Sequence, residues 1–351
     1  MVRPFLPDEF GVSELLDPLA EALSRLQAES SSVRVAVALS GGADSAMLAV
    51  HAAIAARRLP GIELHCFHIH HGLQAAADGW QAHVHRLAAG LGLPCHSRRV
   101  DVEQSSGKGV EGAARQARYA GLQHLAAVCG VTHILLAHHR DDQTETVLMR
   151  LLRGAGPTGL AAMAPVSVRD GMTYGRPWLD VDRALIVNAA HEFAARTGWE
   201  FVNDPTNVDD IYTRGAVRQR LVPVLNDRWP AWRGILARHA RQARELAGVV
   251  EEVAAEDLAC LDPSADGSDF SLKAWRELSE ARQVLVLRHW LARQGLRAPT
   301  EARTRELCRQ LRGLHQLGHD RSMRMPHDGH VIVCERGRVR LLRTYDNDES
   351  R

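Results

Sequence analysis

One junction between a strand, a loop and a helix constrains the fold of this chain more than any other stretch. Val33, Val35, Val37 and Leu39 alternate with other residues, which predicts a buried strand that runs directly into a glycine-containing turn. Gly41 and Gly42 would let the backbone approach an anion closely, and the next helix would point its free N–H groups and its dipole at the same place. The junction therefore predicts a phosphate-binding loop.

The amino-acid sequence of the loop excludes two common phosphate-binding motifs. A Walker loop needs a lysine after its last glycine, and a dinucleotide loop needs G-x-G-x-x-G. The loop resembles instead the SGGxDS loop of the N-type ATP pyrophosphatases, which implies ATP as cofactor, with Mg²⁺ bound by Asp44. In the simpler alternative, Asp44 only caps a helix. The expected ATP-binding residues of the loop are Ser40, Gly41, Gly42, Ala43, Asp44 and Ser45.

Strand and helix patterns alternate four times in the first part of the chain. Further strands are predicted at residues 63–70, 95–100 and 133–137, each separated from the next by a helix pattern. This alternation is typical of an α/β fold with a doubly wound parallel sheet, which the resemblance specifies as adenine nucleotide α-hydrolase-like. Ligands of such sheets bind at the carboxyl ends of the strands, so residues 40–45, 68–73 and 138–145 are expected to converge there.

Two domains are expected from the change of pattern after Pro223. Residues 1–225 form the predicted catalytic domain, with a lead-in helix at 12–28, a hairpin at 165–174 and a helix at 181–196. Residues 226–351 form a second, mainly helical domain. Its predicted helices are 228–260, 271–294 and 300–313, and short β-like runs follow at 322–343.

A pair of acids follows the fourth predicted strand. Asp142 and Glu145 are three residues apart, so their carboxylates share one helical face. Acids are also favoured in a first helical turn by the helix dipole alone. Beside an ATP site, however, paired carboxylates suit metal binding or the positioning of an amine nucleophile.

Several further motifs narrow the resemblance to the tRNA(Ile)-lysidine synthetases. They are His68–Leu73, Glu111–Tyr119, His138–Met163, Arg176-Pro177 and Asn203–Asn207. The resemblance implies that ATP adenylates O2 of the wobble cytidine in an isoleucine tRNA with a CAU anticodon. Free lysine then attacks C2 of the base, and AMP leaves.

The resemblance also assigns roles to residues outside the loop. His138, Asp142 and Glu145 would handle lysine and the reacting base, Arg115 would approach the phosphate or the base, and His70 would line the adenine side. Gly215 departs from the family pattern, which usually has Asn there. Many family members also have a further C-terminal domain, for which this chain is expected to be too short.

A basic stretch runs from Arg214 to Arg244, with eight arginines and one acid. One interpretation is a solvated helix whose two ends carry opposite charge, because acids follow from Glu245 onward. The other is a surface that grips tRNA phosphates. The residues expected to bind tRNA are Arg214, Arg218, Arg233, Arg238 and Arg241.

Composition limits the remaining possibilities. The net charge is +1, so any contact with RNA must come from local patches. The six cysteines show no short paired spacing, which argues against a disulfide framework or a zinc site. No signal peptide or membrane span is visible, so we expect a cytoplasmic protein with no membrane partner. The sequence leaves the oligomeric state open, with a homodimer as one possibility.

Three alternatives are weighed against a lysine ligase. A tRNA-thiolating enzyme of the same superfamily would commonly need paired cysteines, and an amidotransferase would need a nucleophilic cysteine ahead of Cys66. A catalytically inert RNA-binding homologue would not need Asp44, Asp142 and Glu145.

The histidines at 65, 68, 70 and 71 and Cys66 could be taken for a metal-binding cluster. We do not expect a metal site there, because strand alternation divides these side chains between two faces of the sheet.

Overall fold

The computed structural model describes residues 10–70, 72, 77–101, 109–203, 213–314 and 323–343. The chain divides into two compact units, Met1–Arg244 and Glu245–Arg351. The division falls within helix α10 (Trp232–Cys260), whereas the sequence predicts a boundary near residue 225, which stays a prediction. Three parts of the expected motifs, namely His71, Leu73 and residues 204–207, lie outside the described residues.

The first unit contains a six-stranded sheet in which β5 alone is antiparallel to its neighbour. The strand order is β3-β2-β1-β4-β6-β5. The strands are β1 (Val33–Ala38), β2 (Ile62–His70), β3 (Cys95–Arg99), β4 (His133–Leu135), β5 (Val166–Arg169) and β6 (Met172–Gly175).

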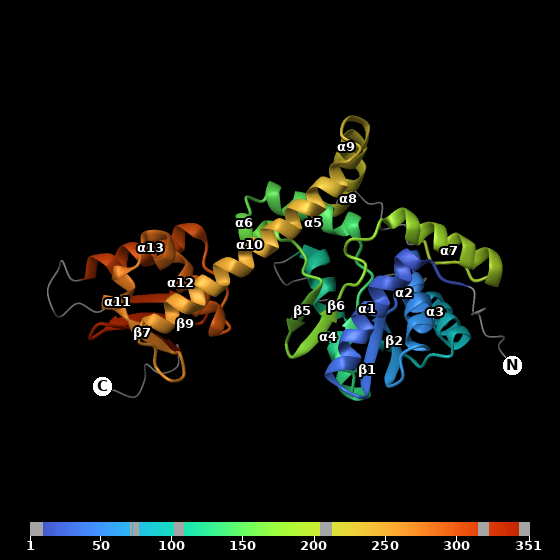
Figure 1. Ribbon diagram of the computed structural model, residues 1–351, viewed down its shortest axis with the longest axis horizontal. Coiled ribbons are helices and arrows are strands. Elements are labelled where there is room, and N and C mark those ends of the chain that lie inside the picture. Colours follow the sequence, from blue (N-terminus) through green and yellow to red (C-terminus); the bar gives the residue numbers. More distant parts are fainter. Residues whose placement is uncertain are drawn as a thin grey trace. The chain divides into compact units, whose positions relative to one another are not determined.

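Helices cover both faces of this sheet (Figure 1). Val33, Val35 and Val37 of β1 pack into a core with α1, α2, α3 and α7, whereas Ala36 faces a second core with α4. Alternation along the strand thus builds both layers, and the expected doubly wound fold is confirmed. The helices are α1 (Ser13–Glu29), α2 (Ala43–Ala56), α3 (Ala77–Leu91), α4 (Gly109–Cys129), α5 (Arg140–Leu152), α6 (Pro157–Leu160) and α7 (Arg183–Thr197).

The strand order reverses between β1 and β4, and this position determines where a ligand can bind. The chain continues from β1 to β2 and β3 on one side, then crosses to β4 on the other. β1 and β4 are parallel neighbours, with Val35 opposite His133 and Val37 opposite Leu135. The loop after β1 and the segment after β4 therefore leave the same edge of the sheet side by side.

A short helical segment links the sheet to α10. It consists of α8 (Thr213–Ala216), a π-helical turn at Val217–Leu221 and α9 (Val222–Arg228). The predicted helix at 228–260 begins only at Trp232, because the chain is non-helical at Trp229 and Pro230.

The second unit combines helices with a sheet. Its antiparallel strands lie in the order β7-β10-β9-β8, and two-residue turns at Asp328-Gly329 and Arg336-Gly337 join the last three. These residues have positive φ, as tight hairpins require. The strands are β7 (Asp269–Ser271), β8 (Met323–His327), β9 (His330–Glu335) and β10 (Arg338–Arg343).

The predicted helix at 271–294 is wrong as a single element. It is divided into α11 (Leu272–Glu277) and α12 (Glu280–Arg293), and α13 (Glu301–Gly313) follows. Ser271 caps α11 and Ser279 caps α12, with Leu278 extended between them. A serine cap competes with helix continuation, and the apolar spacing of the sequence did not reveal it.

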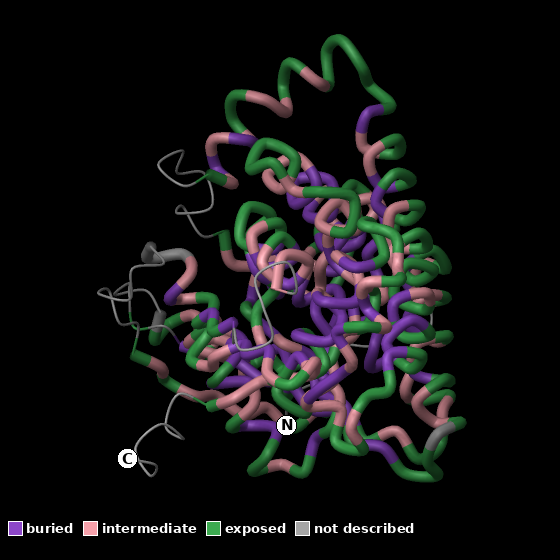
Figure 2. The backbone as a smooth tube through the Cα atoms, turned by 90° about the vertical axis from the view of Figure 1, so that its left-hand side faces the viewer, coloured by how far each residue is buried: buried purple, intermediate pink, exposed green. Residues whose placement is uncertain are grey.

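The core of the second unit includes Phe270, Trp275 and Trp290, all fully buried. Buried residues gather inside the fold, purple in Figure 2, with exposed residues in green around them. Within the described ranges, no helix combines the length and the apolar character that a membrane crossing requires.

A buried histidine in the first unit makes its stability sensitive to pH. The His51 side chain is fully buried on α2, its Nδ1 lies 2.8 Å from the Met47 carbonyl oxygen, and its ring contacts Trp178 edge-on. Burial lowers the pKa of His51 to about 4, although the hydrogen bond to Met47 acts in the opposite direction. Folding therefore keeps this ring neutral at pH values where the unfolded chain is protonated.

We expect the His51→Gln variant to depend less on pH than the original chain. The unfolded chain binds the proton of His51 from about pH 6.5 downward, and the folded chain only near pH 4, so stability is lost as the pH falls. Between pH 7 and pH 4 the original chain should lose about 3 kcal/mol more than the variant. Urea unfolding at several pH values measures this loss. The control His191→Gln replaces an exposed histidine on α7, and an equal effect there would contradict the assignment.

Candidate active site

The loop after β1 is held in shape by one serine hydroxyl. Ser45 Oγ accepts hydrogen bonds from the backbone N–H groups of Ser40 (3.1 Å) and Gly41 (3.2 Å) and donates one to the Gly42 carbonyl (3.1 Å). The carbonyl of Gly41 accepts a hydrogen bond from the Val202 N–H at 2.9 Å. Ser45 thus shapes the loop from within, while the loop leads into the N-terminus of α2.

Asp44 lies in the first turn of α2, between two basic side chains. Its Oδ1 is 3.6 Å from Arg183 Nε, and its Oδ2 is 3.7 Å from His139 Nε2. The Oδ1 atom is buried and has no hydrogen-bond partner among the described residues. A carboxylate oxygen that accepts no hydrogen bond from the described part of the chain and lies beside a phosphate-binding loop is the kind of hard donor that Mg²⁺ prefers, so Asp44 fits the expected metal.

His139 connects the two loops at the reversal of strand order. It follows β4, its side chain is buried, and its Nε2 lies 3.4 Å from Asp142 Oδ2. The backbone N–H of His139 donates to the same carboxylate at 3.2 Å. Burial opposes protonation, but the carboxylates of Asp44 and Asp142 outweigh it and raise the pKa of His139. A protonated His139 would balance both acids.

His138, which precedes it, has the opposite character. Burial lowers the pKa of His138 to about 3, and the positive charges of Arg176 and Arg118 act in the same direction, against the attraction of Asp142. Its Nδ1 is buried and has no hydrogen-bond partner within the described residues. His138 is therefore neutral at physiological pH, with a ring nitrogen open to a ligand.

The two expected acids lie together on α5 and are both buried. Arg218 makes a two-pronged contact with Glu145, with Nε 2.7 Å from Oε1 and Nη2 2.9 Å from Oε2. Its Nη2 also lies 3.4 Å from Asp142 Oδ1, and Arg214 Nε lies 3.5 Å from Glu145 Oε2. Two guanidinium groups thus compensate two carboxylates.

The pKa values of the two acids are shifted in opposite directions by their surroundings. Burial raises the pKa of Glu145, and the contact with Arg218 only partly offsets the effect. Burial also disfavours ionised Asp142, but His139 and Arg214 outweigh it and lower the pKa of Asp142. The environments of two neighbouring carboxyl groups therefore push their proton affinities apart, which is a common property of catalytic pairs. Arg218 itself lies on a π-helical turn, a feature frequent at functional sites.

Two arginines on α4, Arg115 and Arg118, lie near the site formed by His138 and the two acids. The exposed Arg115 donates from Nη2 to the Tyr119 hydroxyl at 3.4 Å, and its guanidinium lies 5.3 Å from the ring centre. Arg118 is half-buried, and its charge influences both His138 and Asp142. Burial and the neighbouring Arg115 lower the pKa of Arg118. The structure thus places the charge of Arg118 near Asp142 and the charges of both arginines near His138.

His70 ends β2, one strand away from the loop. Its Nε2 lies 2.9 Å from Asp78 Oδ1, and its Nδ1 accepts a hydrogen bond from the Gly72 N–H at 3.1 Å. His68 donates from Nδ1 to the carbonyl of Leu39, the residue before the loop, at 2.9 Å. His65 belongs to the other face, beside Phe67, so the expected division of these histidines is confirmed.

The arginines of α10 are not equivalent. Arg233 donates to Asp141 Oδ2 at 2.9 Å and to Asn226 Oδ1 at 2.6 Å, and it stacks on Trp232. Arg238 and Arg241 are exposed. Arg214, Arg218 and Arg233 therefore already have carboxylate partners, whereas Arg238 and Arg241 present their charge to solvent.

Several contacts were not foreseen from the sequence. Gln143 holds both backbone groups of Met163, accepting from its N–H at 2.9 Å and donating to its carbonyl at 3.0 Å. Arg244 donates to the same carbonyl at 2.7 Å. Arg183 approaches Asp44, and the buried Arg176 holds the Ala164 carbonyl at 2.8 Å. Gln143 and Arg176 lie in motifs that carry the resemblance, whereas no motif or periodicity pointed to the contacts of Arg183 and Arg244.

Two family models match the chain. A PP-loop domain matches residues 15–225, and a TilS substrate binding domain matches residues 270–340. The first match includes the loop, both acids and Arg214 and Arg218. The second lies within the second compact unit.

Curated relatives cover most of the chain. A tRNA(Ile)-lysidine synthase from Bordetella bronchiseptica is 58% identical over 92% of this chain and 92% of its own length. One from Polaromonas naphthalenivorans is 42% identical over 86% and 88%. Among solved structures, the U34-tRNA thiolase NcsA from Methanococcus maripaludis has a TM-score of 0.55 at 14% identity, covering 66% of this chain and 79% of its own. That last likeness concerns the fold alone.

The backbone of the loop predicts different costs at its two glycines. Gly41 has φ +97°, and an added Cβ would lie 3.1 Å from Val84 Cγ2 and 3.2 Å from Val202 Cγ2. Gly42 has φ −71°, and nothing lies closer to its added Cβ than 3.8 Å. We expect Gly41→Ala to lower the free energy of unfolding by at least about 1 kcal/mol and Gly42→Ala to be nearly neutral. Urea denaturation measures both, and equal effects would contradict the loop conformation.

Proposed function

This chain belongs to the tRNA(Ile)-lysidine synthase family, and on that premise we propose that it joins lysine to the wobble cytidine of an isoleucine tRNA with a CAU anticodon, using ATP. The observation that carries the proposal is the buried pair Asp142 and Glu145, which lies beside the phosphate-binding loop. An ATP-dependent ligase of this kind needs a phosphate site and an amine site that share one edge of the sheet.

The first proposed step is adenylation of the base. The backbone of the loop and the N-terminus of α2 would bind the outer phosphates of ATP, so that O2 of cytidine attacks the α-phosphorus and pyrophosphate leaves. A Mg²⁺ ion held by Asp44 would neutralise charge on the departing pyrophosphate. Arg183 is 3.6 Å from the same carboxylate and would contribute a further positive charge there. His70 would line the adenine side.

The second proposed step is attack by the side-chain amine of lysine at C2 of the base, with release of AMP. Asp142 and Glu145 would attract the ammonium group and orient its nitrogen. Neutral His138 would accept a hydrogen bond at its open Nδ1 from the same amine once a proton is lost. Arg115, assisted by Arg118, would approach the phosphate of the activated base.

Arg214 and Arg218 set the charge of the amine site. In the structure Arg218 donates to both oxygens of Glu145 and Arg214 lies 3.5 Å from one of them, so a bound lysine must share that carboxylate or displace one guanidinium group. Their proposed contact with tRNA would follow from such a displacement, because a released guanidinium group is free to bind phosphate. Gly215, where the family usually has Asn, is buried between them.

The proposed contacts with the tRNA backbone divide along α10. Arg238 and Arg241 are exposed and suit phosphate contacts directly, whereas Arg233 is held by Asp141. A homodimer stays a prediction. A cytoplasmic location also stays a prediction, and it is expected because tRNA and ATP are both available in the cytoplasm. Thiolation is the competing activity and becomes an outcome of the assay below.

The two steps can be separated by two readouts on the same protein. With the isoleucine tRNA, ATP and Mg²⁺, exchange of labelled pyrophosphate into ATP reports adenylation, and labelled lysine in RNA reports transfer. We expect Asp44→Asn to lose both. We expect Glu145→Gln to keep exchange but to lower kcat/KM for lysine by about 100-fold, because a buried charge partner of the ammonium is removed.

The matched control for this assay is Glu192→Gln, an exposed acid on α7. It should leave both readouts unchanged. Lysine kinetics in Glu145→Gln equal to those of the original chain would remove Glu145 from the amine site. Sulfur rather than lysine in the tRNA of the unaltered enzyme would favour thiolation.

The exposed arginines of α10 should control tRNA affinity through salt. Replacing Arg238 and Arg241 together by alanine removes two phosphate contacts, so the slope of log K against log salt should fall by about 2. Filter binding at several salt concentrations measures the slope. Arg58→Ala, which replaces an exposed arginine after α2, is the control. An unchanged slope in the double variant would assign these arginines to solvent alone.

A further inference from the structure

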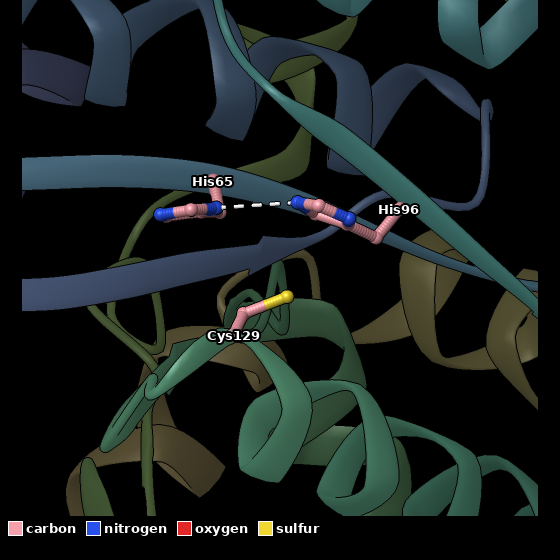
Figure 3. Close-up of side chains that lie close together, drawn as sticks. All are labelled: His65, His96 and Cys129. Carbon is pink, nitrogen blue, oxygen red and sulfur yellow. Dashed lines mark hydrogen bonds between the residues drawn. The ribbon is translucent and has the colours of Figure 1, made fainter.

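Three potential metal ligands meet at the amino-terminal part of the sheet, away from the loop edge (Figure 3). His65 lies on β2, His96 is the second residue of β3, and Cys129 ends α4. Their ligand atoms, an imidazole nitrogen from each histidine and the Cys129 Sγ, all lie within 4.8 Å of one another. His65 is buried, and the other two residues are half-buried.

The separation of the two imidazole nitrogens is informative. His65 Nδ1 lies 3.5 Å from His96 Nε2, which is longer than a normal N–H hydrogen bond of about 2.7–3.2 Å. Two nitrogens bound tetrahedrally to Zn²⁺ at about 2.0–2.1 Å would lie about 3.3–3.4 Å apart. The observed distance is therefore close to the one that a shared cation imposes.

A neighbouring carboxylate fixes which nitrogen of His65 faces the cluster. Glu63 Oε1 lies 3.1 Å from His65 Nε2, so this nitrogen carries the hydrogen and Nδ1 presents its lone pair to His96. A carboxylate that orients the far side of an imidazole is the usual companion of a metal-ligating histidine. The lone pair thus points at the space that the three side chains share.

The surroundings also suit the sulfur ligand. Arg34 on β1 donates from Nε to Glu63 on β2 at 2.8 Å and from Nη1 to the Cys129 carbonyl at 3.3 Å. These bonds connect the end of α4 to β1 and β2. Burial raises the pKa of Cys129, whereas burial and the neighbouring His65 lower the pKa of His96. A metal ion binds the thiolate rather than the thiol, so binding at Cys129 would release the thiol proton to solvent.

We propose that His65, His96 and Cys129 form a binding site for a thiophilic divalent cation of the Zn²⁺ type, with a water molecule as fourth ligand. The site joins β2, β3 and α4 and lies outside the set of residues that bind ATP or lysine. Zn–S and Zn–N bonds of about 2.3 and 2.0–2.1 Å require the three ligand atoms to lie a few ångströms apart, and here all of them lie within 4.8 Å of one another.

Cobalt titration of the full chain, after removal of metals by a chelator, tests the site. One equivalent of Co²⁺ should give the visible bands of a four-coordinate ion and a thiolate-to-cobalt charge-transfer band. Cys129→Ser should remove the charge-transfer band, and His96→Ala should abolish stoichiometric binding. Glu63→Gln, which alters only the companion carboxylate, should weaken binding by about 10-fold to 100-fold.

Matched controls separate this cluster from other thiols. Cys95→Ser replaces a half-buried cysteine beside His96, and Cys260→Ser replaces an exposed one, so both should bind Co²⁺ like the original chain. Zn²⁺ should also raise the thermal unfolding midpoint of the original chain and of both controls, but not that of Cys129→Ser. No stoichiometric spectrum in the original chain, a charge-transfer band that persists in Cys129→Ser, or one lost in either control would overturn the proposal.

Discussion

The parallel pairing of β1 with β4 is the constraint on which the rest of the first unit depends. It places two segments, each at the carboxyl end of its strand, side by side at the point where the strand order reverses. The glycine loop brings Asp44, and the following segment brings His139 and Asp142. Contacts of 3.4 Å and 3.7 Å from His139 Nε2 to the two acids show that one imidazole joins both segments.

Charge compensation is the second requirement of this site. Asp142 and Glu145 are buried on α5, and an uncompensated carboxylate there would be costly. Arg214 and Arg218 arrive from a segment about seventy residues later and supply the balance. The same positive charges serve two purposes in our proposal, because they balance the two carboxylates before lysine binds and become available when its ammonium group arrives. The strong preference of arginine for two-pronged contacts makes this exchange chemically reasonable.

The fold was predictable where the pattern was local. Alternation in residues 33–39 and the following helix spacing anticipated β1, α2 and the order of strands and helices in the first unit. Prediction failed at 271–294, where Ser271 and Ser279 each start a helix, and it did not anticipate β7. Strand β7 is only three residues long and pairs with β10, almost seventy residues away, so no local period could reveal it.

The sequence alone determined the phosphate-binding loop and the acid pair on one helical face, because both depend on spacings of a few residues within single elements. Tertiary structure alone decided which arginines meet those acids, which ring of the two adjacent histidines stays neutral, and that His65, His96 and Cys129 share one space. These outcomes depend on burial and on contacts between distant elements. Burial and long-range contacts are both determined by tertiary packing, and neither can be predicted from the local order of residues.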